Sequence, residues 1–273
     1  MEDGRAESPR IAAVQIAQEA GQLLLDRFGR ALQVRHKGVV DLVTEADELS
    51  ERFIIRALRE RFPSHAVLAE ESGASSSDTG TCRHRWLVDP LDGTTNFAHG
   101  YPIFAVSMAL EVDRVVMLGV VYVPALRELY VAERGTGATL NGEPINVSST
   151  DDLIHSLVAT GFQYDPRARG GNLPHWASFV QVTQGARRSG AAAFDLCCVA
   201  AGRLDGYWET GLAPWDSAAG VLAVQEAGGR VTTFSGDPFR VDAAECVASN
   251  GRIHAQMQTV LARVPRDFTG VPS

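Results

Sequence analysis

The chain has 273 residues, of which 45% are hydrophobic and 21% charged, as in a globular protein with one large domain or two that share a core. Its formal net charge of −8 disfavours a nucleic-acid-binding protein, because such proteins bind through basic patches. No apolar run reaches the ~20 residues of a membrane span, and the polar start MEDGRAESPR lacks the apolar core of a signal peptide, so we expect a cytoplasmic protein with no membrane partner.

The first half of the chain is predicted to form two amphipathic helices followed by strands. The helices cover about residues 10–28 and 45–61, and Ile11 is predicted on the inward face of the first. The predicted strands cover about residues 65–69, 86–88, 103–112, 115–123, 128–132 and 137–140, with an Asn141-Gly142 hairpin turn after the last.

Beyond about residue 150, helix and strand signals alternate. They fall in segments 153–160, 176–182, 191–201 and 217–227, and strands are expected at 230–233 and 244–248. We therefore predict a mixed α/β (α+β) protein with two lobes, an N-terminal α+β lobe over residues 1–150 and a C-terminal α/β lobe over residues 151–273.

The most informative segment is the octad DPLDGTTN, which begins at Asp89 directly after the short apolar strand. Pro90 restricts the backbone around it, so that Asp89 and Asp92 can face the same point. Gly93 permits a tight turn, and Thr94 is a residue type that starts helices, whose free N–H groups bind phosphate. Hard carboxylate ligands beside such groups suit Mg²⁺ and phosphate together. The alternative is a capped turn with two solvated aspartates.

Two further acidic segments are weaker signals by themselves. Glu70 and Glu71 follow the short strand that ends near Ala69, where a solvated acidic turn is the simpler interpretation. Asp216 precedes the apolar run of a helix, where aspartate is a favoured N-cap.

Together, DLVTEAD from Asp41, DPLDGTTN from Asp89 and WDSAAG…EAGG from Trp215 resemble the inositol monophosphatase family of Mg²⁺-dependent, lithium-sensitive phosphatases. The resemblance extends from about Asp41 to Gly229. It implies a layered αβαβα sandwich of the sugar-phosphatase type with two sheets, and commonly a homodimer. The N-terminal lobe would carry the metal and phosphate motif, and the C-terminal lobe would complete the active site.

The resemblance also implies two or three Mg²⁺ ions. The implied metal ligands are Glu70, Asp89, the backbone carbonyl of Leu91, Asp92 and Asp216. Asp89 would bridge the first two ions, and Glu71 would help to hold a further, weaker one.

The implied catalytic set comprises Asp47, Glu70, Asp92 and Thr94. Thr94 and Asp47 would orient and deprotonate the attacking water, while the amides of Gly93 and Thr94 would hold the phosphate. Asp47 has an alternative role as an acidic residue near a helix N-terminus, where the helix dipole favours it.

The implied substrate contacts are Asp92, Gly93, Thr94, Ala192, Glu209 and Asp216. A carboxylate at Glu209 accepts hydrogen bonds from hydroxyl groups and so suits a polyol, although it could also be a solvated loop residue. Arg188 is expected near the site or the dimer edge, or as half of a surface pair with Arg187. The segment 162–174 is expected to shape the pocket.

These features predict a phosphoric monoester hydrolase that releases phosphate from inositol-1-phosphate or a similar polyol or sugar phosphate by metal-activated water. Related family members act on histidinol phosphate, fructose-1,6-bisphosphate, NADP or phosphoadenosine phosphate, so these substrates remain alternatives. A mainly non-catalytic interaction protein is a further alternative.

Overall fold

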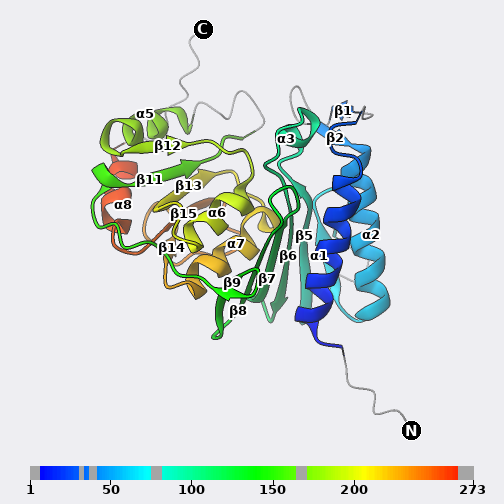
Figure 1. The fold of residues 1–273 in the computed structure, drawn as a ribbon. Coiled ribbons are helices and arrows are strands. Elements are labelled where there is room, and N and C mark those ends of the chain that lie inside the picture. The colour runs from blue at the N-terminus through cyan, green and yellow to red at the C-terminus, as the bar shows by residue number, and fades with distance from the viewer. Residues whose placement is uncertain (1–6, 31–33, 37–41, 75–81, 164–170, 264–273) are drawn as a thin grey trace.

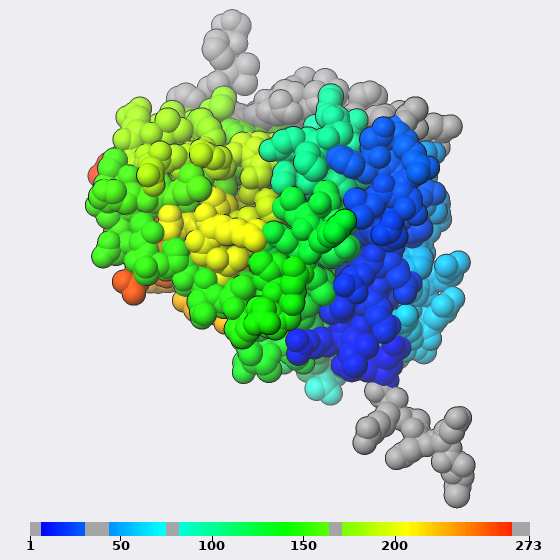
Figure 2. Space-filling view, viewed as in Figure 1, coloured from blue at the N-terminus to red at the C-terminus, as the bar shows by residue number. Residues whose placement is uncertain are grey.

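The computed structural model describes residues 7–30, 34–36, 42–74, 82–163 and 171–263. Two β-sheets alternate with three layers of helices, and this confirms the predicted αβαβα sandwich (Figure 1). In the space-filling view, the blue and cyan N-terminal helices form one side of the molecule, and segments after residue 150 form the opposite side (Figure 2). Among the described residues, no helix is long and apolar enough to cross a membrane.

The larger sheet has eight strands in the order β10-β9-β8-β7-β6-β5-β3-β4. β3 and β5 are parallel, and the other neighbouring pairs are antiparallel. The strands are β3 (Ala66–Ala69), β4 (Gly73–Ala74), β5 (His84–Asp92), β6 (Ala105–Val112), β7 (Val115–Val123), β8 (Glu128–Glu133), β9 (Gly137–Leu140) and β10 (Glu143–Pro144). The predicted Asn141-Gly142 turn joins β9 to β10, with positive φ at both residues.

One face of this sheet is covered by α1 (Pro9–Leu25) and α2 (Glu45–Arg61). The prediction for α1 was wrong at Ile11, whose side chain is 56% exposed. The buried face of α1 is shifted by one residue and begins at Ala12 and Ala13, because small alanines let the helix approach the strands closely. The two short strands β1 (Val34–His36) and β2 (Leu42–Thr44) pair with each other just before α2.

The other face of the sheet packs against α6 (Ala192–Ala200) and α7 (Pro214–Glu226), which lie between the two sheets. The second sheet has the order β12-β11-β13-β15-β14. Its strands are β11 (Leu157–Thr160), β12 (Gly185–Arg187), β13 (Gly206–Thr210), β14 (Arg230–Thr232) and β15 (Glu245–Ser249). The outer layer contains α5 (Leu173–Val182) and α8 (His254–Ala262), and the short helices are α3 (Thr94–Ala98) and the 3-10 turn η1 (Leu153–His155).

The two predicted lobes share one buried cluster. Leu87 and Val121 of the larger sheet belong to the same apolar cluster as Ala159 and Tyr207 of the smaller one. The larger sheet uses residues before 150 and the smaller sheet residues after it. A division into two domains at this boundary stays a prediction.

Candidate active site

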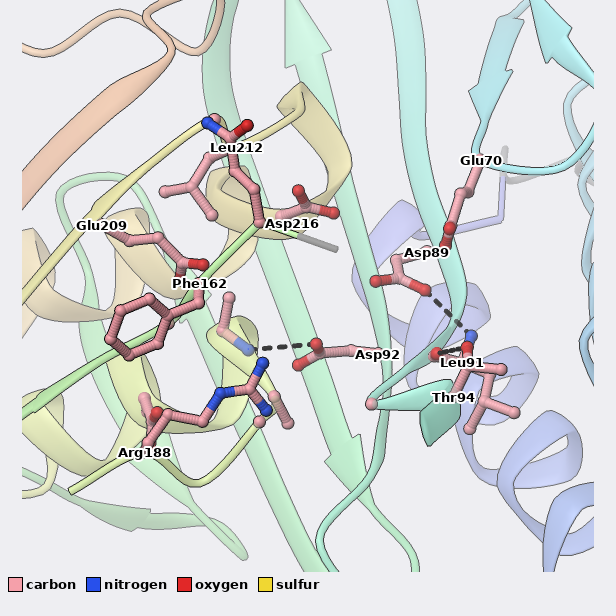
Figure 3. A pocket seen from close by; sticks show the side chains of 18 residues that line it. Glu70, Asp89, Leu91, Asp92, Thr94, Phe162, Arg188, Glu209, Leu212 and Asp216 are labelled. Atoms are coloured by element: carbon pink, nitrogen blue, oxygen red, sulfur yellow. Dashed lines mark hydrogen bonds between the residues drawn. The ribbon is translucent and has the colours of Figure 1, made fainter. Parts of the chain in front are cut away.

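A cavity of about 290 Å³ lies where β5 ends and α3 begins. The predicted site residues line it, with the exceptions of Asp47 and Glu71. Figure 3 shows Glu70, Asp89, Leu91 and Thr94 on one side and Phe162, Glu209, Leu212 and Asp216 on the other, with Asp92 between them. The structure therefore brings together residues that lie more than 140 positions apart in the sequence.

The acidic turn at the end of β5 has a fixed backbone. The pairing of β5 with β6 is interrupted between Asp89 and Asp92, where the register shifts. The amide of Leu91 donates to Asp89 Oδ1 at 2.9 Å, and the hydroxyl of Ser50 donates to the carbonyl of Pro90 at 2.9 Å. These contacts turn both aspartates toward the cavity (Figure 3).

Gly93 occupies a position that other residues would strain. Its φ is +91°, and a Cβ atom would lie 2.9 Å from the carbonyl oxygen of Ile103. Only glycine fits both requirements at low cost. Because α3 starts at the next residue, the amides of Gly93 and Thr94 can approach a bound anion closely.

Asp47 lies behind the cavity wall and reaches it through Thr94. The hydroxyl of Thr94 lies 2.7 Å from Asp47 Oδ1 and 3.1 Å from the carbonyl of Leu91. Asp47 Oδ2 accepts from the amide of Thr44 at 2.8 Å and from its hydroxyl at 2.6 Å, which completes a capping box at the start of α2. Asp47 is therefore both an acidic residue in the first turn of α2, as one interpretation has it, and a partner of Thr94, as the other requires.

The opposite wall comes from the C-terminal half of the chain. Successive amides at the start of α6 donate to the carboxylate of Asp92, from Ala192 at 3.0 Å and Ala193 at 2.9 Å. Asp216 lies in the first turn of α7 and accepts from the amide of Ala213 at 2.7 Å. Glu209 lies on β13 with 9% exposure and accepts from the hydroxyl of Tyr207, so it is a buried strand residue and not a solvated loop residue.

Acidic side chains far outnumber basic ones in the cavity. Burial, followed by repulsion from Glu70, Asp92 and Asp216, raises the pKa of Asp89 well above its usual value. Burial also raises the pKa of Asp92 and of Asp216 to about 7. Among the described lining residues, Arg188 is the single cationic side chain, and it points into the cavity (Figure 3).

These carboxylates fit the chemistry of a hard divalent cation. Oxygen ligands are what Mg²⁺ binds, and crowded buried carboxylates with raised pKa values are stabilised by a positive charge. As they stand, no three acidic, histidine or cysteine groups of the described chain converge tightly enough to hold an ion. Asp89, Asp92 and Asp216 instead accept hydrogen bonds from backbone amides. Metal ligation by this set stays a prediction.

The sequence interpretation missed Asp195. It lies in the first turn of α6, lines the cavity and is 2% exposed, and burial raises its pKa to about 7. A single acidic residue within the apolar segment AAAFDLCCVA was an available signal. Of the segment 162–174, Phe162 and Gln163 line the cavity, while residues 164–170 lie outside the described residues.

Comparison with known proteins shows which family the chain belongs to. The family model described as "Inositol monophosphatase family" matches residues 6–266. An inositol-1-monophosphatase of Synechocystis sp. is 46% identical over 252 residues, which cover 91% of this chain and 87% of the relative. A Nus factor SuhB of Pseudomonas aeruginosa is 40% identical over 255 residues, covering 91% and 94%.

Solved structures agree with the sequence comparison. The inositol monophosphatase from Anabaena (Nostoc) sp. has a TM-score of 0.85 at 41% identity, covering 94% of this chain and 96% of that one. The extragenic suppressor protein suhB from Bartonella henselae has a TM-score of 0.88 at 40% identity, covering 93% and 98%. From the family match over nearly its whole length and from this shared fold, the chain belongs to the inositol monophosphatase family.

Proposed function

We propose that this protein is a Mg²⁺-dependent phosphoric monoester hydrolase that acts on inositol-1-phosphate or a similar polyol or sugar phosphate. One observation carries the proposal: buried carboxylates, the turn at Gly93 and the hydroxyl of Thr94, which donates to Asp47 behind the wall, meet in one cavity. The two or three Mg²⁺ ions of the proposal would be held by Glu70, Asp89, the Leu91 carbonyl, Asp92 and Asp216, with Glu71 contributing to the weakest. A homodimer and a cytoplasmic location stay predictions.

The chemistry divides between the ions and the chain. Bound Mg²⁺ lowers the pKa of water and neutralises phosphate charge. The amides of Gly93 and Thr94 orient the phosphoryl oxygens. Thr94 Oγ accepts a hydrogen bond from the attacking water while its own proton is directed to Asp47 Oδ1, 2.7 Å away. Because burial raises the pKa of Asp47, this carboxylate is a better proton acceptor than an exposed aspartate.

The leaving group would lie toward the wall formed after residue 160. Glu209 and the backbone at Ala192 lie there beside Phe162, and all three line the cavity. A carboxylate is an acceptor for the hydroxyls of a polyol, while the ring of Phe162 offers an apolar surface to the C–H faces of a sugar. This wall supports a polyol or sugar over a purely apolar leaving group.

Phosphate release across a substrate panel tests the proposal. Inositol-1-phosphate, fructose-1,6-bisphosphate, histidinol phosphate, NADP and phosphoadenosine phosphate are each incubated with the protein in Mg²⁺ and in chelator. We expect Mg²⁺-dependent release that is fastest with inositol-1-phosphate. Faster phosphate release from another substrate of the panel would support the proposed reaction but assign a different substrate. No release from any of them would contradict the proposed activity.

A second candidate function follows from the relatives that carry another name. Proteins of about 40% identity are named Nus factor SuhB, so this chain could act through a protein partner without turnover. The cavity argues for catalysis, because a pure interaction protein has no need of several buried acidic groups that raise one another's pKa. Complete inactivity in the panel, together with an intact fold, would favour the second candidate.

A further inference from the structure

A second cavity, of about 490 Å³, lies away from the candidate active site. Its lining includes Arg85 of β5 and Glu111 of β6, which pair across the sheet, whereas Asp92 at the other end of β5 pairs with Ala105. Seven residues of strand separate Arg85 from Asp92, on the order of 20 Å. The two cavities share no lining residue and are separated along β5, although both border the start of α7.

A buried ion pair forms part of the second cavity. Arg85 donates through Nε at 2.8 Å and Nη2 at 2.6 Å, and both bonds go to Oε2 of Glu111. Glu111 is 1% exposed, and its other oxygen, Oε1, has no hydrogen-bond partner within the described part of the chain. Because Oε1 is closed to solvent, Glu111 neutralises Arg85 and does not offer an oxygen to a ligand in the cavity.

Three more arginines surround the opening. Arg240 uses Nε and Nη2 to bind Asp242 at 3.0 and 3.1 Å, and Arg134 binds the carbonyl of Val116 at 2.7 Å and the side chain of Gln225 at 3.3 Å. A guanidinium has five N–H donors, so both retain donors for an anion. In total, four arginines and two carboxylates line the cavity of a chain whose net charge is −8.

The remaining wall is apolar. Val116, Val221 and Leu222 are buried beneath the cavity, and Phe239 and Val241 complete its side. The volume lies within the range of small-molecule sites. An inositol phosphate has no apolar body to cover this wall, and a metal ion would be repelled by the arginines.

We propose that this cavity is a binding site for a small amphipathic anion, a molecule with one acidic group and an apolar body. The acidic group lies among Arg114, Arg134 and Arg240, where guanidinium groups recognise carboxylate, phosphate or sulfonate. The apolar body covers Val221 and its neighbours. The site is independent of the proposed phosphatase activity.

The probe 1-anilinonaphthalene-8-sulfonate has both features: a sulfonate and aromatic rings. Titration of the full chain, followed by probe fluorescence, is expected to show one saturable site. The double variant Arg114→Glu/Arg240→Glu alters two exposed side chains and is expected to weaken binding about tenfold or more, the loss of at least one charge-assisted hydrogen bond. Thermal unfolding of each variant verifies that the fluorescence does not report an exposed core.

Two single Arg→Glu variants serve as controls, each with half of the charge change of the double variant. Arg252→Glu lies outside both cavities, and Arg188→Glu removes the cation of the candidate active site. Neither is expected to change the affinity for the probe. Weaker binding in Arg188→Glu alone would assign the probe to the active-site cavity and overturn the proposal. The proposal would also be overturned if the double variant bound the probe as tightly as the wild type, or if the wild type showed no saturable binding of the probe.

Discussion

The two walls of the candidate active site are built in different ways. The acidic turn from Asp89 to Asn96 is one continuous segment whose geometry is set by Pro90, Gly93 and local hydrogen bonds. The facing wall combines Phe162, Arg188, Glu209 and Leu212, which come from separate elements of the second half of the chain. The continuous segment can keep the same reaction chemistry. A substitution in any one element of the facing wall can change which ligand binds.

Asp92 is the point where the two walls meet, and its substitution is expected to have the largest effect. Asp92→Asn removes the charge proposed to hold a metal ion and replaces one oxygen that accepts from the α6 amides. We expect the rate of phosphate release to fall about a thousandfold, as for loss of a major charge-stabilising group. The measurement is kcat with saturating Mg²⁺ and inositol-1-phosphate.

The fold of this variant needs a separate check, because Asp92 also anchors α6. Circular dichroism and the unfolding temperature should stay close to those of the wild type, since an amide side chain keeps one acceptor oxygen. Near-normal activity in a folded Asp92→Asn protein would contradict the proposed role of the acidic turn.

The same contrast explains what the sequence could predict. The acidic turn was predictable because its residue types act on their own backbone: proline restricts φ, and glycine permits a φ of +91°. The inward face of α1 was assigned wrongly at Ile11, because hydrophobicity favoured a large side chain where close packing uses alanines. β13, which carries Glu209, was not predicted, since a five-residue strand depends on its neighbours β11 and β15 for definition.

For other residues the local sequence gives at most a weak signal. Asp195 is acidic, yet only the packing of α6 against the turn brings it into the cavity. Asn96 donates hydrogen bonds to the carbonyls of Ile103, at 2.7 Å, and of Ser189, at 2.8 Å. The second bond connects the acidic turn to a loop 93 positions away. Such contacts depend on tertiary structure and leave no periodic signal in the sequence.

The assembled wall gives the second prediction, of intermediate size. Glu209→Ala removes the buried acceptor proposed for a polyol hydroxyl, and loss of one such bond costs about 1–3 kcal/mol. We expect the KM for inositol-1-phosphate to rise about tenfold. Hydrolysis of p-nitrophenyl phosphate, whose leaving group has no free hydroxyl, is expected to change little, because it uses only the acidic turn.

Tyr207→Phe is the matched control, since it removes the donor to Glu209 and leaves the carboxylate in place. Its effect on the inositol-1-phosphate KM should be smaller than that of Glu209→Ala. An equal loss with both substrates in Glu209→Ala would indicate a general structural role and would remove the distinction between the two walls.

The third prediction concerns pH and is the smallest in size. In the folded chain, burial raises the pKa of Asp92 and Asp216 to about 7, above the usual value of 3.8. The folded state therefore binds more protons than the unfolded chain between about pH 4 and pH 7, and in chelator its free energy of unfolding falls as the pH rises through this window. Protonation also competes with cation binding, so stabilisation by Mg²⁺ should be larger at pH 8 than at pH 5.

Thermal unfolding at pH 5 and pH 8, with chelator and with Mg²⁺, measures both trends. A saturating ion at a hundred times its Kd stabilises the folded state by about 2.7 kcal/mol, which corresponds to several degrees for a chain of this length. Asp92→Asn removes one of several buried acidic groups with raised pKa values and should reduce the pH dependence in chelator without abolishing it. If Mg²⁺ raised the unfolding temperature equally at both pH values, the cation would bind away from these carboxylates. The acidic turn would then have to act without the positive charge on which its proposed chemistry depends.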